Sequence, residues 1–124
     1  MIYAYVLDPI LREWFEDLQV RRPEVHIAFT YRGKADQDRF FREGKSRAKY
    51  GASPHNYLPA LAIDIFFLVD GKYHLDKSWL ESIAATLPKG IYWGGNFKSF
   101  KDMPHFERDG WKSLASGFPN GNKP

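Results

Sequence analysis

The sequence predicts an α+β domain, a small antiparallel sheet with flanking helices. Apolar residues recur at helical spacing over residues 10–18, which indicates an amphipathic helix. Apolar runs at 25–31 and 61–69 have the length and pattern of strands, and an Asp-Gly turn after the second run favours a hairpin over a repeated βαβ unit. The 124 residues suit one compact domain, expected over residues 1–115, with a flexible tail at 116–124.

The amino-terminal part of the chain is expected to form a helix and then a strand. Asp8 followed by Pro9 is typical of an N-cap with proline in the first helical turn, and the helix should end before Pro23. Large apolar residues then alternate from Val25 to Tyr31, which is the period of a half-buried strand.

A second, shorter helix is expected from about Ala35 to Glu43, with Gly44 ending it. Its aromatic pair, Phe40 and Phe41, is assigned to the core. The segment from Gly44 to Pro59 has no periodic pattern and is predicted to be a long loop. A structureless loop of about 15 residues in a small domain is usually functional or disordered, so this one is a candidate part of a site.

The remaining elements follow from turn and capping signals. Ser78-Trp-Leu-Glu81 has the pattern of a capping box that begins a helix, which should run to about Leu87. The other expected elements are a strand at 61–69, its hairpin partner at 72–75, a strand at 91–95 that runs into two glycines, and a returning strand at 103–108.

Composition narrows the chemistry that is available. The absence of cysteine excludes disulfides, thiolate metal sites and a cysteine nucleophile, so any metal must use His, Asp or Glu. The opening residues lack the pattern of a secretory signal, and no stretch approaches the roughly 20 apolar residues of a membrane helix. We therefore expect a monomer that is made in the cytoplasm, has no stable membrane association and is released by something other than its own signal.

The net charge of +3 is mild. Basic residues concentrate in one region, which is interpreted as a solvated surface or as a surface that attracts an anionic polymer; its members are Arg39, Arg42, Lys45, Arg47 and Lys49.

Asp64 is the anomaly in the strand pattern, because it stands alone in an apolar run. Burying a carboxylate is costly unless a partner or a metal neutralises it. His55 before the strand and His105 near the end of the chain supply two imidazoles. Two histidines and one aspartate leave the fourth tetrahedral position of zinc open, as catalytic zinc sites do.

Asp102 lies three residues before His105, and the two side chains would face opposite sides of a regular strand. The intervening Met103-Pro104 can break that regularity, because proline removes a ladder donor and marks a bulge or an edge. Both side chains can then face one cavity.

Five elements in order resemble the hedgehog-like zinc peptidases of peptidoglycan. This family includes D-alanyl-D-alanine carboxypeptidases and the L-alanyl-D-glutamate endopeptidases used as phage endolysins. Its pattern is an arginine after a strand, then S-x-H, A-x-D and an acid-x-x-His unit. The matching elements are Thr30-Tyr-Arg32 with Gln37, Ser53-Pro-His55, Ala62-Ile-Asp64, Trp93-Gly-Gly95 and Asp102-Met-Pro-His105-Phe-Glu107.

The resemblance implies a role for each matched residue. It assigns zinc to His55, Asp64 and His105, proton transfer to Asp102, and binding of the carbonyl oxyanion or of a substrate carboxylate to Arg32. The other implied roles are substrate contact or support of the site for Ser53 and Gln37, a place on the substrate cleft for Trp93, and orientation of a ligand histidine by Glu107.

Two departures from the family pattern stand out. Asp64 follows His55 by nine positions where the family usually has seven, and the usual glycine between them is absent. A longer loop can keep both ligands in place because each is anchored at a different end. Asp102 stands where many relatives have glutamate, and aspartate here is frequent in the cell-wall endopeptidase branch.

The sequence therefore predicts a zinc-dependent peptidase that acts on peptidoglycan stem peptides and not on nucleic acid. The resemblance favours an L-alanyl-D-glutamate endopeptidase that works as a phage endolysin and reaches the wall from the cytoplasm of an infected bacterium once the membrane is permeabilised. One alternative is a D-alanyl-D-alanine carboxypeptidase. A second is a non-catalytic basic module that binds wall polymer or nucleic acid and uses zinc only for structure.

Overall fold

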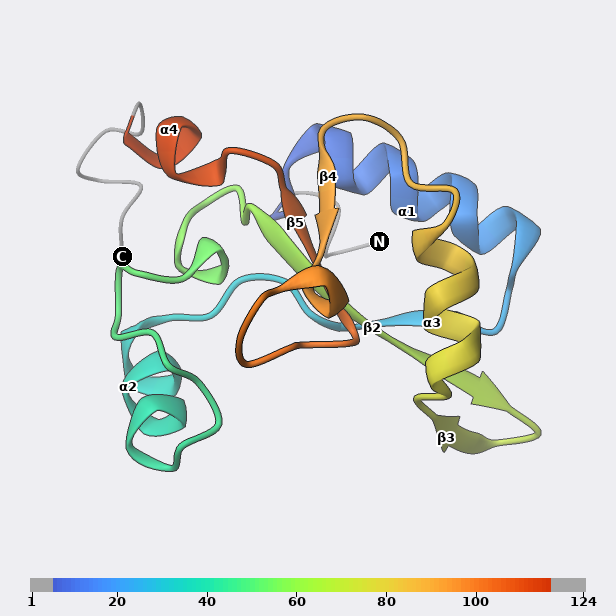
Figure 1. Cartoon of the computed structure of the whole chain (residues 1–124), viewed down its shortest axis with the longest axis horizontal. Coiled ribbons are helices and arrows are strands. Elements are labelled where there is room, and N and C mark those ends of the chain that lie inside the picture. Colours follow the sequence, from blue (N-terminus) through green and yellow to red (C-terminus); the bar gives the residue numbers. More distant parts are fainter. Residues whose placement is uncertain (1–5, 117–124) are drawn as a thin grey trace.

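A computed structural model describes residues 6–116 of the chain. The helices are α1 (Pro9–Arg21), α2 (Lys34–Arg42), α3 (Lys77–Ala84) and α4 (Trp111–Ser116), and the strands are β1 (Val25–Phe29), β2 (Ala62–Val69), β3 (Lys72–His74), β4 (Ile91–Trp93) and β5 (His105–Arg108). Two short 3-10 turns, η2 (Pro54–Asn56) and η3 (Gly94–Asn96), complete the fold (Figure 1). None of the described helices has the length and apolar character needed to cross a bilayer.

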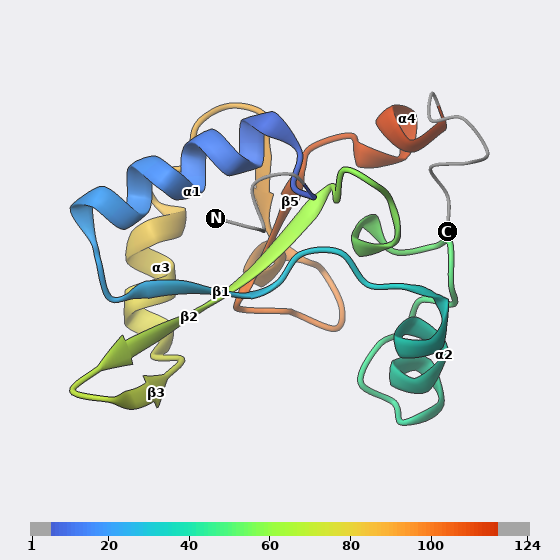
Figure 2. The ribbon, with the colours of Figure 1, turned by 180° about the vertical axis from the view of Figure 1, so that it is seen from behind.

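The sheet is antiparallel throughout and has β2 at its centre. The strand order is β1-β2-β5-β4, and β3 pairs with the end of β2 through the predicted hairpin. The view from behind shows β1 running along β2, with α1 and α3 toward one end of the sheet and α2 toward the other (Figure 2). This arrangement confirms the predicted α+β fold.

Alternation along β2 separates the core from the site. Ile63, Ile65 and Phe67 are fully buried and pack against apolar residues of α1 and α3. Asp64 lies between the first two of these side chains, so the strand period turns it to the opposite face of the sheet. The register pairs Asp64 with His105 of β5. The aspartate is thus tolerated in an apolar strand because it does not enter the core.

The structure confirms the predicted helices α1 and α2 and the residues that begin and end them. Asp8 Oδ2 accepts hydrogen bonds from the backbone N–H groups of Ile10 and Leu11, at 2.9 and 3.2 Å, as an N-cap does. Gly44 follows α2 with a φ of 73°, the left-handed conformation that ends helices.

The prediction of a capping box at Ser78 is wrong. Helix α3 begins at Lys77, with Asp76 as its N-cap and no side-chain cap. The carbonyl of Asp76 already accepts hydrogen bonds from Trp79 and Leu80, both at 3.1 Å, so Ser78 lies inside the first turn. Helix α3 ends at Ala84, before the predicted Leu87.

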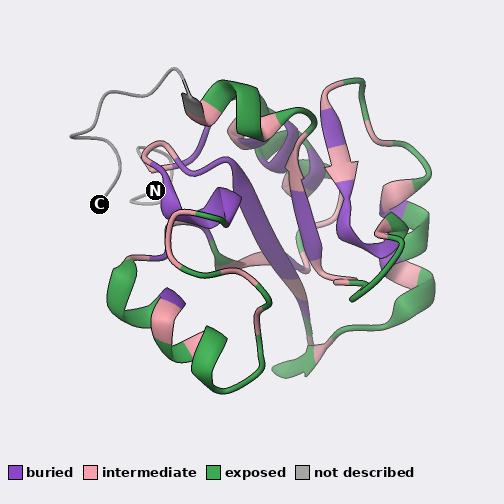
Figure 3. Cartoon of the chain, turned by 60° about the vertical axis from the view of Figure 1, so that its left-hand side comes forward, coloured by how far each residue is buried: buried purple, intermediate pink, exposed green. Residues whose placement is uncertain are grey.

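Two further differences concern α2 and the end of the chain. Helix α2 fully buries only Gln37, and its Phe41 is 38% exposed, so the aromatic pair is not part of the core (Figure 3). Helix α4 was not predicted, and it extends through Ser116. The tail expected at 116–124 therefore begins in this helix, and its residues 117–124 lie outside the described part of the chain.

Candidate active site

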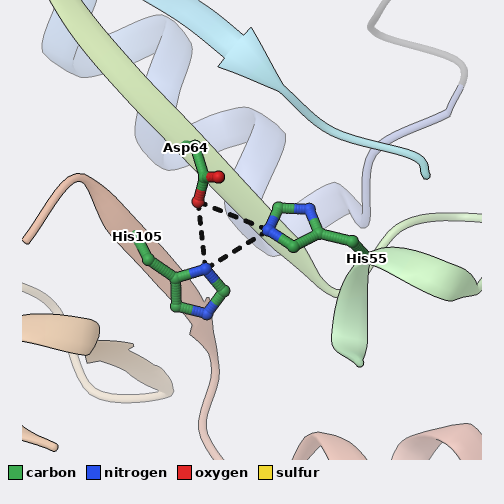
Figure 4. Close-up of side chains that lie close together, drawn as sticks. All are labelled: His55, Asp64 and His105. Atoms are coloured by element: carbon green, nitrogen blue, oxygen red, sulfur yellow. Dashed lines mark hydrogen bonds and ion pairs between the residues drawn. The ribbon is translucent and has the colours of Figure 1, made fainter. Parts of the chain in front are cut away.

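Three side chains that are distant in sequence converge at one point of the sheet (Figure 4). His55 Nε2 lies 3.2 Å from His105 Nδ1, and both nitrogens face Asp64 Oδ1, at 3.3 and 3.0 Å respectively. His55 comes from η2, Asp64 from β2 and His105 from β5. The structure thus brings together the three residues to which the resemblance assigned zinc.

Partners behind each histidine determine which ring nitrogen faces the centre. His55 Nδ1 is 2.6 Å from the carbonyl oxygen of Thr30, and His105 Nε2 is 2.7 Å from Glu107 Oε1. Because a carbonyl and a carboxylate only accept hydrogen bonds, these ring nitrogens are the donors. The opposite nitrogens are then available as metal ligands, as in carboxylate–histidine–zinc arrangements. Glu107 therefore orients a candidate ligand and is not a surface ion pair.

The geometry of the three donor atoms fits zinc. Zinc bonds to nitrogen and oxygen of about 2.0–2.2 Å place neighbouring ligands of a tetrahedron about 3.3–3.6 Å apart. The observed separations of 3.0–3.3 Å are a few tenths shorter than, or equal to, those of one tetrahedral face. These are the only described residues that form such a cluster of potential metal ligands.

The electrostatics of the cluster also favour a cation. Burial alone would raise the pKa of Asp64, but the charge of His55 and hydrogen bonds from His105 and His55 lower it well below its ordinary value. Burial alone would lower the pKa of His105, but hydrogen bonds to Asp64 and Glu107 raise it to about 10. Positive charge, carried by a proton or by a metal, is therefore stabilised between these side chains.

Asp102 approaches the same centre from the loop before β5. Its Oδ2 lies 3.9 Å from His105 Nδ1, and its side chain is 46% exposed. Partial burial and the nearby Asp64 raise the pKa of Asp102, while His105, His55 and Arg32 oppose this shift. A raised pKa makes the carboxylate a better proton acceptor. Strand β5 begins only at His105, so the predicted break at Met103-Pro104 does place both side chains on one cavity.

Gly94 holds the loop that carries Asp102 in place. The Asp102 backbone N–H donates to the carbonyl of Gly94 at 3.0 Å. A Cβ atom at Gly94 would overlap the carbonyl oxygen of Asp102 and crowd the Cβ atoms of Asp102 and His105. Close backbone approach therefore accounts for the first glycine after Trp93.

Gly94→Ala is accordingly expected to lower kcat by about 10²-fold, because a shift of about 1 Å in a reacting group has that effect. The readouts are turnover rate and metal content, and most of the bound metal should be retained. Gly71→Ala is the control. It strains a left-handed hairpin glycine with open space around it, so it should lower stability without changing kcat. Equal activity of Gly94→Ala and the parent would contradict this role.

Arg32 is buried beside the centre. Its Nη2 lies 3.8 Å from Asp64 Oδ2, and its guanidinium lies 4.6 Å from the ring centroid of Phe40. Burial lowers the pKa of Arg32, and the charges of Asp64 and Asp102 oppose the shift. An arginine at this place can bind a carbonyl oxyanion or a carboxylate.

A buried amide network supports Arg32 and His55. The Oε1 atom of Gln37 accepts from Arg32 Nη1 at 3.2 Å and from Asn56 Nδ2 at 3.1 Å, and Asn56 Nδ2 also donates to the carbonyl of Arg32 at 3.0 Å. Ser53 caps η2 by accepting from the His55 N–H at 3.2 Å. Gln37 therefore positions other groups, and Ser53 both positions His55 and lines the cavity.

Sequence reasoning missed Asn56, although the pattern Ser53-Pro-His-Asn56 contains the signal for it. The structure shows a capping box in which Ser53 and Asn56 are the two members.

The predicted contact of Trp93 with substrate is corrected. Its indole is 8% exposed, packs in the core cluster and donates from Nε1 to the carbonyl of Met103 at 2.7 Å. The alternation of β4 turns Trp93 to the core face, where it is paired with Phe106. Its hydrogen bond to Met103 helps to fix the backbone next to Asp102.

The centre lies in a cavity of about 740 Å³, within the range of ligand sites. Sequence reasoning missed most of its aromatic lining, which includes Phe29, Phe40, Phe97, Phe100 and Trp111. These residues come from the end of β1, from α2 and α4, and from the loop before β5, so no local pattern marks them as one surface.

Two imidazole nitrogens and a carboxylate oxygen with room for a fourth ligand, beside a second carboxylate in a cavity, define the site class of mononuclear metallohydrolases. The chain belongs to the M15 peptidase family, since the family model described as D-alanyl-D-alanine carboxypeptidase matches residues 46–108. This range contains the three candidate ligands and Asp102. It confirms the family that the sequence elements indicated.

Two known proteins show the same relationship. The chain is 31% identical over 102 residues to the peptidoglycan L-alanyl-D-glutamate endopeptidase CwlK of Bacillus subtilis (strain 168), a match that covers 68% of this chain. The chain spans about 60% of the length of that curated relative. The crystal structure of the L-Ala D-Glu endopeptidase ChiX of Serratia marcescens superposes with a TM-score of 0.70 and 21% identity, covering 91% of this chain and 87% of that chain. The latter likeness supports the fold.

Proposed function

We propose that this protein is a zinc-dependent peptidase that hydrolyses peptidoglycan stem peptides between L-alanine and D-glutamate. The observation that carries the proposal is the convergence of His55, Asp64 and His105 on one point, with Asp102 beside them in a cavity. Membership of the M15 family supports the peptidase chemistry. The names of both relatives support the choice of bond.

Each residue has a distinct task in this proposal. His55, Asp64 and His105 hold zinc, which when bound lowers the pKa of water and polarises a carbonyl group. Asp102 accepts the proton of the attacking water and delivers it to the leaving amine. Arg32 binds the carbonyl oxygen as negative charge develops on it. The partners Thr30 and Glu107 keep the two histidines in the orientation that this chemistry needs.

A D-alanyl-D-alanine carboxypeptidase is the second candidate, and the description of the matching family model favours it. Both candidates use the same residues and differ in the bond that is cleaved. The third candidate, a basic module without catalysis, makes no use of a carboxylate placed beside the metal ligands.

Digestion of purified muropeptides by the zinc-loaded protein, followed by mass spectrometry, separates the three candidates. The proposed endopeptidase produces new free amino termini on D-glutamate. Loss of the terminal D-alanine would overturn this assignment in favour of the carboxypeptidase. Unchanged muropeptides would contradict both enzymes and favour the binding module, whose affinity for an anionic polymer should fall steeply with salt.

The biological setting is also a proposal. We infer a monomeric phage endolysin that is made in the bacterial cytoplasm, reaches the wall after the membrane is permeabilised, and binds neither nucleic acid nor membranes stably. Aspartate at position 102, as in the endopeptidase branch that the sequence resembles, supports the endopeptidase activity on which this inference rests. Expression in a bacterium with a susceptible wall should cause lysis only when a holin is expressed with it. Lysis by the protein alone would contradict this route.

A further inference from the structure

The cavity around the candidate site is lined by charges of both signs. The wall at the metal centre carries three carboxylates, Asp64, Asp102 and Glu107, together with the guanidinium of Arg32. The exposed wall is made by the segment 45–48 and by α4, and it carries the cations Lys45, Arg47 and Lys112. A ligand that fills this cavity therefore meets these cations as well as the catalytic groups.

Arg47 packs against an aromatic ring of another loop that lines the cavity. Its guanidinium lies 4.6 Å from the ring centroid of Phe100, which comes from the loop before β5 and is itself 42% exposed. The contact joins two loops that both line the cavity. A cation–π contact holds a guanidinium in place without neutralising its charge.

Two other cations that line the cavity are paired with acids, whereas Arg47 is not. Lys45 Nζ lies 3.2 Å from Glu43, and Arg32 faces Asp64 at 3.8 Å. Among residues 6–116, no carboxylate lies within ion-pair distance of Arg47 or of Lys112. Arg47 instead contacts the ring of Phe100, and Lys112 contacts the ring of Trp111. Their charge is thus available to a ligand.

A buried amide fixes the backbone on both sides of Arg47. Gln37 Nε2 donates to Ser46 Oγ at 3.1 Å and to the carbonyl of Ala48 at 2.7 Å. The same side chain accepts from Arg32 through Oε1. The fully buried Gln37 therefore fixes the position of Arg32 relative to the segment that carries Arg47. A site for a ligand of fixed length needs such a rigid spacing between its binding groups.

We propose that Arg47, assisted by Lys112, forms a subsite that binds the free carboxylate of the glutamate residue in the substrate. The inference rests on the proposed function. A glutamate whose amino group and one carboxyl group are in amide bonds keeps a second carboxyl group, which is ionised at neutral pH. The protein thus selects stem peptides with a free glutamate carboxylate over those in which this group is a carboxamide.

Two synthetic peptides that differ only in this carboxylate or carboxamide provide the test. The wild-type protein is expected to have a kcat/KM about three- to tenfold higher for the carboxylate, because the pair is charge-assisted but partly exposed. Arg47→Gln should reduce the preference to nearly one, chiefly by lowering kcat/KM for the carboxylate peptide. The preference should also shrink at high salt, since salt screens exposed charges.

Arg42→Gln is the matched control. It removes the same charge from the same basic region, but Arg42 lines a separate, smaller hollow and not the catalytic cavity. The preference of Arg42→Gln for the carboxylate peptide over the carboxamide peptide should equal that of the wild type. Both variants alter exposed side chains, and their zinc content and thermal unfolding should match those of the parent.

The outcomes separate this inference from the proposed function. Cleavage of both peptides at equal rates, or a preference that survives Arg47→Gln, overturns the subsite and leaves the peptidase intact. If neither peptide is cleaved, the proposed function fails, and calorimetric binding of the same peptides to the zinc-loaded protein still decides the subsite. Tighter binding of the carboxylate that is lost in Arg47→Gln supports it, and equal binding overturns it.

Discussion

Asp102→Ala is expected to bind zinc and fold as the parent does but to lose about 10²–10⁴-fold in kcat, the usual contribution of a positioned general base. Asp102 is close enough to the centre to exchange a proton there, yet it is not one of the three clustered donors. Its side chain is 46% exposed, so truncation leaves no buried cavity. Muropeptide hydrolysis and zinc content measure the two properties separately.

Asp109→Ala is the control for this experiment, because it removes an exposed carboxylate from the turn after β5 without touching the cavity. Its activity should equal that of the parent. Unchanged hydrolysis by Asp102→Ala would show that the proton transfer is assigned to the wrong residue. Loss of zinc in Asp102→Ala would instead make Asp102 a ligand.

Asp64→Ala is expected to lose both the metal and the activity. The variant lacks one of three donor atoms that lie 3.0–3.3 Å apart. Zinc affinity should fall by more than the roughly 10–100-fold that loss of an outer partner of a ligand causes. Elemental analysis after dialysis against a weak chelator measures the bound zinc, and muropeptide hydrolysis should fall to background.

Circular dichroism of the metal-free forms provides the control, since removing a buried carboxylate also removes one partner of Arg32 and one of His105. The zinc-free parent and zinc-free Asp64→Ala should show the same secondary structure. Full zinc stoichiometry with parental affinity in the variant would remove Asp64 from the metal site and, with it, the basis for the hydrolase.

Much of the site was predictable because its residues carry local signals. Asp64 interrupts an apolar strand, and Pro104 breaks the strand before His105. The wider spacing between His55 and Asp64 has no effect on their meeting, since their contact is 3.3 Å. Ser53 and Asn56 cap η2 and anchor His55 independently of the rest of the loop.

Other parts of the site had no local signal. Gln37 was matched by position, but its task of joining Arg32 to the segment 46–48 depends on a contact between a helix and a loop. Trp93 was wrongly predicted to line the substrate cleft, because the face of the sheet to which it points depends on the register of β4 against β5. The contact of Arg47 with Phe100 joins two loops that only the fold brings together.

The amino-acid order alone determined the positions of α1, α2 and the strands, the absence of thiol chemistry and the need to neutralise an acid in an apolar strand. These properties depend on periodicity and on neighbouring residues. Only the tertiary structure decided which nitrogen of each histidine faces Asp64 and which groups line the cavity. Strand pairing brings His105 to Asp64 across 41 positions of sequence, and η2 brings His55 to His105 across 50. Contacts over such separations depend on register and packing, which no short stretch of the chain contains.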